Sequence, residues 1–320
     1  MEKWLVGIDV GGTTIKMAFI TTAGEIVSKW EIPTNTEDGG KYITKEIGQS
    51  LAEKVSELGE SKEKLQGIGI GAPGFINMET GFIYHAVNIG WRDFPLKDSL
   101  EEETGLSVIV DNDANIAALG EMWLGAGDGA NDLLCVTLGT GVGGGIVSNG
   151  NIVQGVNGMA GEIGHLTSVV EGGYQCNCGK TGCLETVASA TGIARLATDG
   201  LSTYSDSSLH QVMEQDGKLT SKAVFDAYAA GDSLAKQAVE TTCFHLGFAI
   251  GNLANAINPA KIVIGGGVSK AGNLLLEPLK KEFIKYALPR VAEGADFAIA
   301  TLGNDAGVIG GAWLAKENSR

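Results

Sequence analysis

The chain has 320 residues, of which 44% are hydrophobic and 19% charged, and its formal net charge is −15. This length is enough for two domains with cores of their own. The excess of acidic residues argues against binding to the phosphate backbone of nucleic acids or to anionic membrane surfaces. We therefore expect no nucleic acid and no membrane among its partners. No apolar run approaches the roughly 18–20 residues of a membrane span, and the first residues lack the pattern of a signal peptide.

Strands dominate the first third of the chain. They are expected over residues 4–10, 25–32, 66–74 and 107–111, and within 11–20, a segment that begins with a Gly-Gly turn. One segment between them has apolar residues every three or four positions, which predicts an amphipathic helix: Ile43, Ile47, Leu51, Val55 and Leu58. Shorter helices are expected over residues 95–104 and 112–125.

The same order of elements then begins again. Strands are expected over residues 132–138, 146–150, 151–155, 261–269 and 296–302, and helices over 186–197, 220–230, 233–257, 272–287 and 304–316. A strand, a glycine turn and a second strand occur in both halves, at residues 6–20 and 134–147. This duplication predicts two related α/β halves with a cleft between them. We expect a smaller domain of residues 1–111 plus about 303–320, and a larger one of 112–302.

The two glycine turns contain the residue types that bind phosphate. Glycine is abundant, at 48 residues, and backbone N–H groups of a tight glycine turn form an anion-binding concavity. The first turn joins an acid, glycines, hydroxyls and a lysine: Asp9, Gly11, Gly12, Thr13, Thr14 and Lys16. The second contains Gly139, Thr140 and Gly141. The alternative is two hairpin turns that need a positive φ. A dinucleotide fingerprint is excluded at the second turn because the chain continues as a strand, not a helix.

A polar turn follows the strand at residues 107–111. Asp111, Asn112, Asp113 and Asn115 lie where that strand gives way to a helix. One of these residues is enough to cap the helix, which is the structural interpretation. Active sites of α/β folds gather at the carboxyl ends of strands. A carboxylate here is suited to take a proton from a substrate hydroxyl, and Asp113 is our candidate for that base.

Residues 161–185 combine acids, a histidine and three of the five cysteines. Glu162 and His165 are spaced i, i+3, so they share a face on a helical turn. His165 with Cys176, Cys178 and Cys183 offers four ligands, as a closed structural zinc site does; a redox disulfide is the alternative. Clustered cysteines in odd number favour a reducing compartment, and hence the cytoplasm. The other two cysteines are expected to be buried.

Together these motifs resemble the ROK family of repressors, open reading frames and sugar kinases, over essentially the whole chain. The resemblance implies the actin-like ATPase, or ribonuclease-H-like, two-domain fold, with a zinc-binding insertion in the larger domain. It implies that the two glycine turns hold the phosphates of ATP, with Asp9 toward Mg²⁺, and that the adenosine is bound at Gly265, Gly266 and Gly267. It implies a sugar site, with Asp113 as base, formed by Asn112, Asp113, Glu162, His165, Glu185, Gly74 and Asn88. His165 then has two roles, one for each ring nitrogen.

Within that family the chain is most similar to bacterial glucokinases. The implied reaction transfers a phosphoryl group from ATP·Mg²⁺ to the 6-OH of glucose, in a protein expected to be a homodimer with structural Zn²⁺. The alternatives are a kinase for N-acetylmannosamine, fructose or allose, a sugar-responsive transcriptional repressor, and a sugar-binding or chaperone-type ATPase without transfer.

Overall fold

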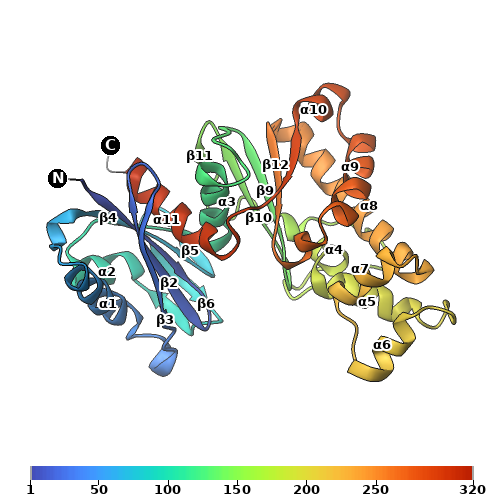
Figure 1. Cartoon of the computed structure of the whole chain (residues 1–320), viewed down its shortest axis with the longest axis horizontal. Helices are drawn as coiled ribbons and strands as arrows, with labels where there is room; N and C mark the ends of the chain where they lie inside the picture. The colour runs from blue at the N-terminus through green and yellow to red at the C-terminus, as the bar shows by residue number, and fades with distance from the viewer. Residues whose placement is uncertain (1, 319–320) are drawn as a thin grey trace. The chain divides into compact units, whose positions relative to one another are not determined.

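A computed structural model describes residues 2–318 of the chain in two compact units (Figure 1). The first unit runs to Gly129 and also takes Gly145–Gly161 and the chain from Leu302 onward; the second is Ala130–Gly144 with Glu162–Thr301. The domain limit predicted between residues 111 and 112 falls within a strand of the first unit. The predicted smaller domain also includes Met1, Ser319 and Arg320, which lie outside the described residues. The division into domains stays a prediction.

The first unit is built on a five-stranded sheet in the order β3-β2-β1-β4-β8. Its strands are β1 (Trp4–Val10), β2 (Thr14–Thr21), β3 (Ile26–Pro33), β4 (Leu65–Ala72) and β8 (Val108–Asn112). β1, β2 and β3 pair antiparallel, whereas β1, β4 and β8 run parallel. Because β1 and β4 are buried over almost their whole length, they read as continuous apolar runs, as interior parallel strands do.

Helices cover this sheet. α1 (Ile43–Glu57) and α2 (Leu96–Thr104) bury their apolar residues in one continuous core with β1 and β4. The last helix, α11 (Ala306–Glu317), and α3 (Asp113–Leu124) belong to the same unit, and Figure 1 shows α11 beside the strands of the N-terminal half. The last helix thus packs on the first half of the chain.

Close backbone contacts hold α11 against the sheet. A Cβ added at Gly7 of β1 would stand 1.8 Å from the carbonyl oxygen of Val308, and one added at Gly69 of β4 would stand equally close to that of Gly311. Only glycine permits such an approach. Around it, Leu5, Ile20 and the apolar residues of α11 form a second core cluster.

A small antiparallel sheet follows β4 and was not predicted from the sequence. Its strands are β5 (Phe75–Asn77), β6 (Phe82–Ala86) and β7 (Trp91–Phe94), in that order. Trp91 is fully buried and donates from its ring nitrogen to the carbonyl oxygen of Gly40, 3.0 Å away. This sheet carries Gly74 at its entry and Asn88 between its last two strands.

The second sheet repeats the order of the first, with strands β11-β10-β9-β12-β13. These are β9 (Leu133–Leu138), β10 (Val142–Ser148), β11 (Asn151–Ile152), β12 (Lys261–Gly265) and β13 (Asp296–Ile299). In both sheets the order is third, second, first, fourth and fifth strand, and the fourth and fifth run parallel to the first. The predicted duplication is therefore confirmed in the topology.

The helices of the second unit follow the predicted order with three differences. They are α4 (Glu185–Ala188), α5 (Ala190–Gly200), α6 (Leu209–Asp216), α7 (Ser221–Ala229), α8 (Ser233–Ile257), α9 (Asn273–Tyr286) and α10 (Pro289–Gly294). The helix expected over residues 186–197 is broken because Ser189 adopts an extended backbone and caps α5 by accepting from the Gly192 amide. α6 and α10 were not predicted.

Among the residues that the structure describes, no helix is both long enough and apolar enough to cross a bilayer.

Candidate active site

Several predicted site residues gather at one edge of the first sheet. β1, β4 and β8 run parallel, so their carboxyl ends meet at the same edge. Asp9 pairs in register with Gly71, and Gly71 with Asp111. Asn112 and Asp113 follow at the end of β8, and Gly74 follows β4. The structure thus brings together the candidate base and the candidate Mg²⁺-directing acid within one unit.

Both predicted roles of the polar turn after β8 are compatible. Asn112 is the cap of α3, because its side chain accepts from the Ala114 amide at 2.9 Å, so the structural interpretation is correct for this residue. Asp113 also accepts from that amide at 2.9 Å and remains exposed. Asp111 is 0% exposed. Of the two acids, only Asp113 is open to a substrate.

Asp9 is a mostly buried acid beside a lysine. Its carboxylate lies 3.7 Å from Lys16 Nζ, and an added Cβ at Gly307 of α11 would stand 2.7 Å from the same carboxylate. Burial raises the pKa of Asp9, and Lys16 opposes that shift only in part. A cation near the first glycine turn would stabilise the ionised acid further, so the residues present fit Mg²⁺ bound with a phosphate ligand.

The first glycine turn is a hairpin connection between β1 and β2. The Gly11 amide donates to the Thr14 carbonyl at 3.0 Å, and the hydroxyl of Thr34 donates to the Gly11 carbonyl at 2.7 Å. Gly11 and Gly12 have no positive φ, so the need for that conformation does not explain them. A Cβ at Gly12 would lie 3.5 Å from that of Asn88, which places Asn88 beside this turn.

In the second unit the second glycine turn and the glycines after β12 are neighbours. β9 and β12 run parallel, with Gly265 opposite Thr137. Gly266 has a φ of 81°, and a Cβ there would stand 2.5 Å from the Leu138 carbonyl oxygen. Gly139 and Gly267 have no other heavy atom within 4 Å of an added Cβ and no positive φ. Neither packing nor backbone conformation therefore accounts for glycine at these two positions.

Four candidate zinc ligands converge in the second unit. The ligand atoms of His165, Cys176, Cys178 and Cys183 all lie within 4.8 Å of one another. Two edges of this group measure 3.6 Å, from Cys178 Sγ to Cys183 Sγ and from Cys176 Sγ to His165 Nδ1. Bonds of about 2.3 Å from zinc to sulfur give tetrahedral edges of roughly 3.8 Å, so the four residues fit zinc. The sulfur separation is also far longer than a disulfide bond of about 2.05 Å.

The two ring nitrogens of His165 face different groups. Its Nδ1 faces Cys176, while its Nε2 lies 3.9 Å from Glu162 Oε2. Glu185 is within 3.5 Å of Cys176 Sγ through Oε1 and accepts from the Val142 amide at 3.1 Å through Oε2. Glu185 therefore joins the cysteine cluster to the second glycine turn, a link that no sequence spacing indicated.

Substituting Cys176 by serine removes one of the four ligands. We expect this variant to hold less zinc and to bind sugar more weakly than the wild type, because Cys176 contacts both His165 and Glu185. Affinity for ATP should change little. Metal analysis with calorimetric titration of sugar and of an ATP analogue measures all three quantities. A loss confined to ATP binding would contradict this division of roles, and Cys135→Ser, outside the cluster, is the control.

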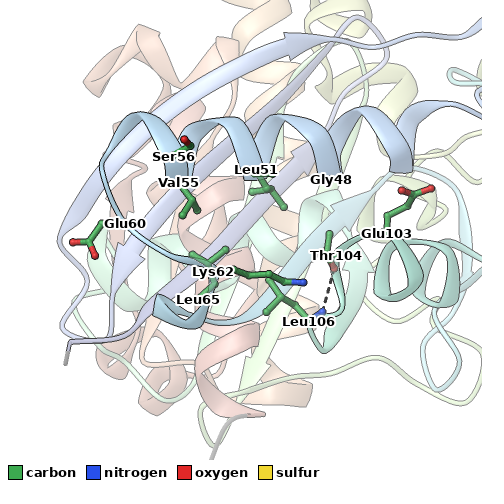
Figure 2. Close-up of a pocket in the computed structure, with 11 residues that line it drawn as sticks. Gly48, Leu51, Val55, Ser56, Glu60, Lys62, Leu65, Glu103, Thr104 and Leu106 are labelled. Atoms are coloured by element: carbon green, nitrogen blue, oxygen red, sulfur yellow. Dashed lines mark hydrogen bonds between the residues drawn. The ribbon is translucent and has the colours of Figure 1, made fainter.

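One cavity lies away from all these residues. It measures about 270 Å³ and lies between α1 and α2, lined by Leu51, Val55 and other residues of the first unit (Figure 2). None of the predicted site residues contributes to it. We therefore do not assign it to the active site.

Comparison with known proteins decides the family. Residues 5–318 match the sequence model described as the ROK family.

The chain belongs to the ROK family.

A glucokinase of Halalkalibacterium halodurans is 69% identical over 316 residues, which are 99% of this chain and 96% of that protein. A crystal structure of a ROK family glucokinase from Streptomyces griseus, in complex with glucose and AMPPNP, has a TM-score of 0.75 at 33% identity and covers 98% of this chain and 99% of its own. A ROK family transcriptional regulator, homologous to the MLC protein of E. coli, has a TM-score of 0.86 at 26% identity, covering 100% of this chain and 79% of its own.

The expected fold class is confirmed by these relatives and by the repeated sheet order. The chain has the duplicated α/β architecture of the actin-like ATPases. Because kinases and a regulator of this family share it, the fold alone does not fix the activity.

Proposed function

We propose that the chain is an ATP-dependent glucokinase, which phosphorylates the 6-OH of glucose to give glucose 6-phosphate. The observation that carries this proposal is the 69% identity, over nearly the full length of both chains, to a protein known as a glucokinase. The exposed Asp113 at the carboxyl edge of the first sheet supports it, because phosphoryl transfer to a hydroxyl needs a group to accept the proton.

In the proposed reaction Asp113 does the proton chemistry. Its carboxylate accepts the proton of the sugar 6-OH as that oxygen attacks the γ-phosphorus of ATP. The bond from the γ-phosphorus to the bridging oxygen breaks, and ADP leaves with that electron pair. The side chains of Asn112 and Asp113 both accept from the Ala114 amide, and these hydrogen bonds fix the turn that carries Asp113. Such positioning makes the main contribution to phosphoryl-transfer catalysis.

The other sugar contacts are proposed to come from acids and amides. Asn112, Glu162, His165 and Glu185 offer acceptors and donors for hydroxyl groups, with Gly74 and Asn88 in neighbouring loops of the first unit. Zinc held by His165 and the three cysteines would brace Glu162 and Glu185. With four protein ligands the metal would have no open position, so its role would be structural.

Phosphate binding is proposed for the glycine turns. The residues are Asp9, Gly11, Gly12, Thr13, Thr14 and Lys16 in the first turn, Gly139, Thr140 and Gly141 in the second, and Gly265, Gly266 and Gly267 for the adenosine. The open space at Gly139 and Gly267 supports close approach of a ligand to the backbone. Mg²⁺ bound with ATP supplies charge neutralisation on the phosphates, and Asp9 is the acid placed to hold it through water.

A coupled assay of ADP release tests the proposal. The purified protein is offered ATP·Mg²⁺ with glucose, N-acetylmannosamine, fructose, allose or a β-glucoside in turn. We expect the highest kcat/KM with glucose, and no ADP release above background without a sugar. A higher kcat/KM with another sugar would identify the protein as a kinase for that sugar and not for glucose. Absence of any sugar-dependent ADP release would refute the kinase function and favour a regulatory or ATPase role.

We further propose a homodimer in the cytoplasm. Large apolar side chains are exposed on and after α8 and α9, with exposures of 42% for Phe244, 62% for Ile284 and 61% for Leu288, which favours burial against a second copy. Unbonded cysteines near one another favour a reducing compartment. Light scattering after size-exclusion chromatography should give twice the chain mass; a monomer mass would contradict the dimer.

A further inference from the structure

Asp111 is a fully buried acid that the proposed reaction does not use. It is the next-to-last residue of β8, two positions before the candidate base, and is 0% exposed. Its Oδ1 accepts from the Asn112 amide and from Asn115 Nδ2, both at 2.7 Å, and its Oδ2 accepts from Gln154 Nε2 at 2.8 Å. Two of these donors belong to the turn that carries Asp113. The third comes from a segment 43 residues away in sequence.

The chemistry of this cluster favours a carboxylate over any other side chain at position 111. An ionised acid is an acceptor only, and all three partners donate N–H groups. A buried charge is costly unless it is paired or hydrogen-bonded, and here burial raises the pKa of Asp111 while the three donors oppose that shift. Packing alone does not explain a carboxylate in this position. Its role follows from the segments that its hydrogen bonds connect.

Gln154 connects Asp111 to a glycine-rich loop. Its side chain donates to Asp111, while its own carbonyl oxygen accepts from the Ala160 amide at 3.0 Å and closes the loop. Within that loop Gly155, Gly158 and Gly161 all have a positive φ. A Cβ at Gly158 would stand 3.0 Å from the Ile76 carbonyl oxygen, so the loop packs closely on β5. Next in the chain comes Glu162, a proposed sugar contact.

We propose that Asp111 and Gln154 are positioning residues: their hydrogen bond fastens the loop 155–161, which leads to Glu162, to the turn that carries Asp113. This loop and the proton acceptor are thereby held in register by one buried carboxylate. This inference rests on the proposed kinase function for its kinetic consequences, but the hydrogen-bonded link itself does not depend on the reaction.

Replacing Gln154 by glutamate tests the link most directly. It sets a second carboxylate against Asp111 and should lower kcat for glucose about 100-fold, whereas Gln154→Met, which only removes the donor, should lower it about tenfold. KM for ATP should stay within about twofold, because the glycine turns are untouched. Adding Asp111→Asn to Gln154→Glu restores a donor–acceptor pair at this position. The double variant should recover to within about tenfold of wild-type kcat.

The same substitutions at Gln211, which is exposed on α6, provide the matched control and should leave kcat unchanged. A Gln154→Glu protein with near-wild-type kcat, or a double variant no better than the single one, would overturn the proposal. So would a loss accounted for entirely by a smaller folded fraction.

Hydrogen exchange read by mass spectrometry separates this inference from the kinase function. In the Gln154→Glu protein we expect faster exchange of the amides in residues 112–116 and 155–160, with recovery in the double variant and no change for Gln211→Glu. If the wild-type protein phosphorylates no sugar, the proposed function fails while this readout still decides the link. Unchanged exchange at residues 112–116 would refute the link whatever the activity.

Discussion

Alanine at position 113 should lower kcat for glucose by about 10²–10⁴-fold, which is the usual contribution of a general base. Asp113 is the exposed acid of its turn, and its Oδ1 bond to the Ala114 amide aims the carboxylate from the start of α3. Binding of ATP should be retained, because Asp113 lies outside the glycine turns. Steady-state kinetics with glucose, together with calorimetric titration of an ATP analogue, measures both effects.

The control for this variant is Asp206→Ala, at an exposed acid outside the site, which should keep wild-type kinetics. A correctly folded Asp113→Ala protein with a kcat within about tenfold of wild type would remove Asp113 from the role of base. The buried Asp111 would be a poor substitute, because its oxygens are already taken by three donors.

Alanine at position 7 is expected to have the largest effect on stability. The added Cβ would stand 1.8 Å from the Val308 carbonyl oxygen, where backbone faces backbone and no side chain is free to move aside. Either α11 or β1 must shift, at a cost of about 3 kcal/mol or more. A loss of that size lowers the melting temperature by roughly 6–12 °C. Differential scanning calorimetry measures it.

Gly294→Ala is the matched substitution for comparison. Gly294 ends α10, has no positive φ, and an added Cβ there meets no heavy atom within 4 Å. It should leave the melting temperature unchanged or slightly higher, since alanine favours helix more than glycine does. If the two alanine variants melted at the same temperature, the close approach of α11 to β1 would not be a stabilising feature.

The sequence indicated most of the fold because its signals are local. The helix over residues 233–257 was predicted with the bounds it has, since Asp232 caps it and its apolar pattern is long. The break at Ser189 was missed because the flanking residues are good helix formers, and tertiary contacts decide the break: the Ala190 amide donates to the Gly139 carbonyl. The sheet β5-β6-β7 was missed because its strands are short and alternate weakly.

The residues of the candidate site also differ in how far local sequence signals could predict them. The metal-ligand candidates lie close together in sequence, so their spacing was informative, and the structure places their ligand atoms together. The glycine turns were recognised, and the alternative explanation, a need for positive φ, does not hold at Gly11, Gly12, Gly139 and Gly141. The bond between Gln154 and Asp111 spans 43 residues and joins common residue types. No local pattern indicates such a pair; only the fold brings it together.

The place of α11 has a consequence for synthesis of the chain. The first unit includes α11, which follows every residue of the second unit in the chain, so its sheet lacks the α11 cover until that helix leaves the ribosome. The second unit contains only residues that emerge earlier. We therefore expect the second unit to reach its native structure first during translation, and the nascent first unit to expose the apolar face around Leu5 and Ile20 until α11 has emerged. Chains that stop before α11 would be substrates for chaperones and proteases, although every residue of the proposed site has been made.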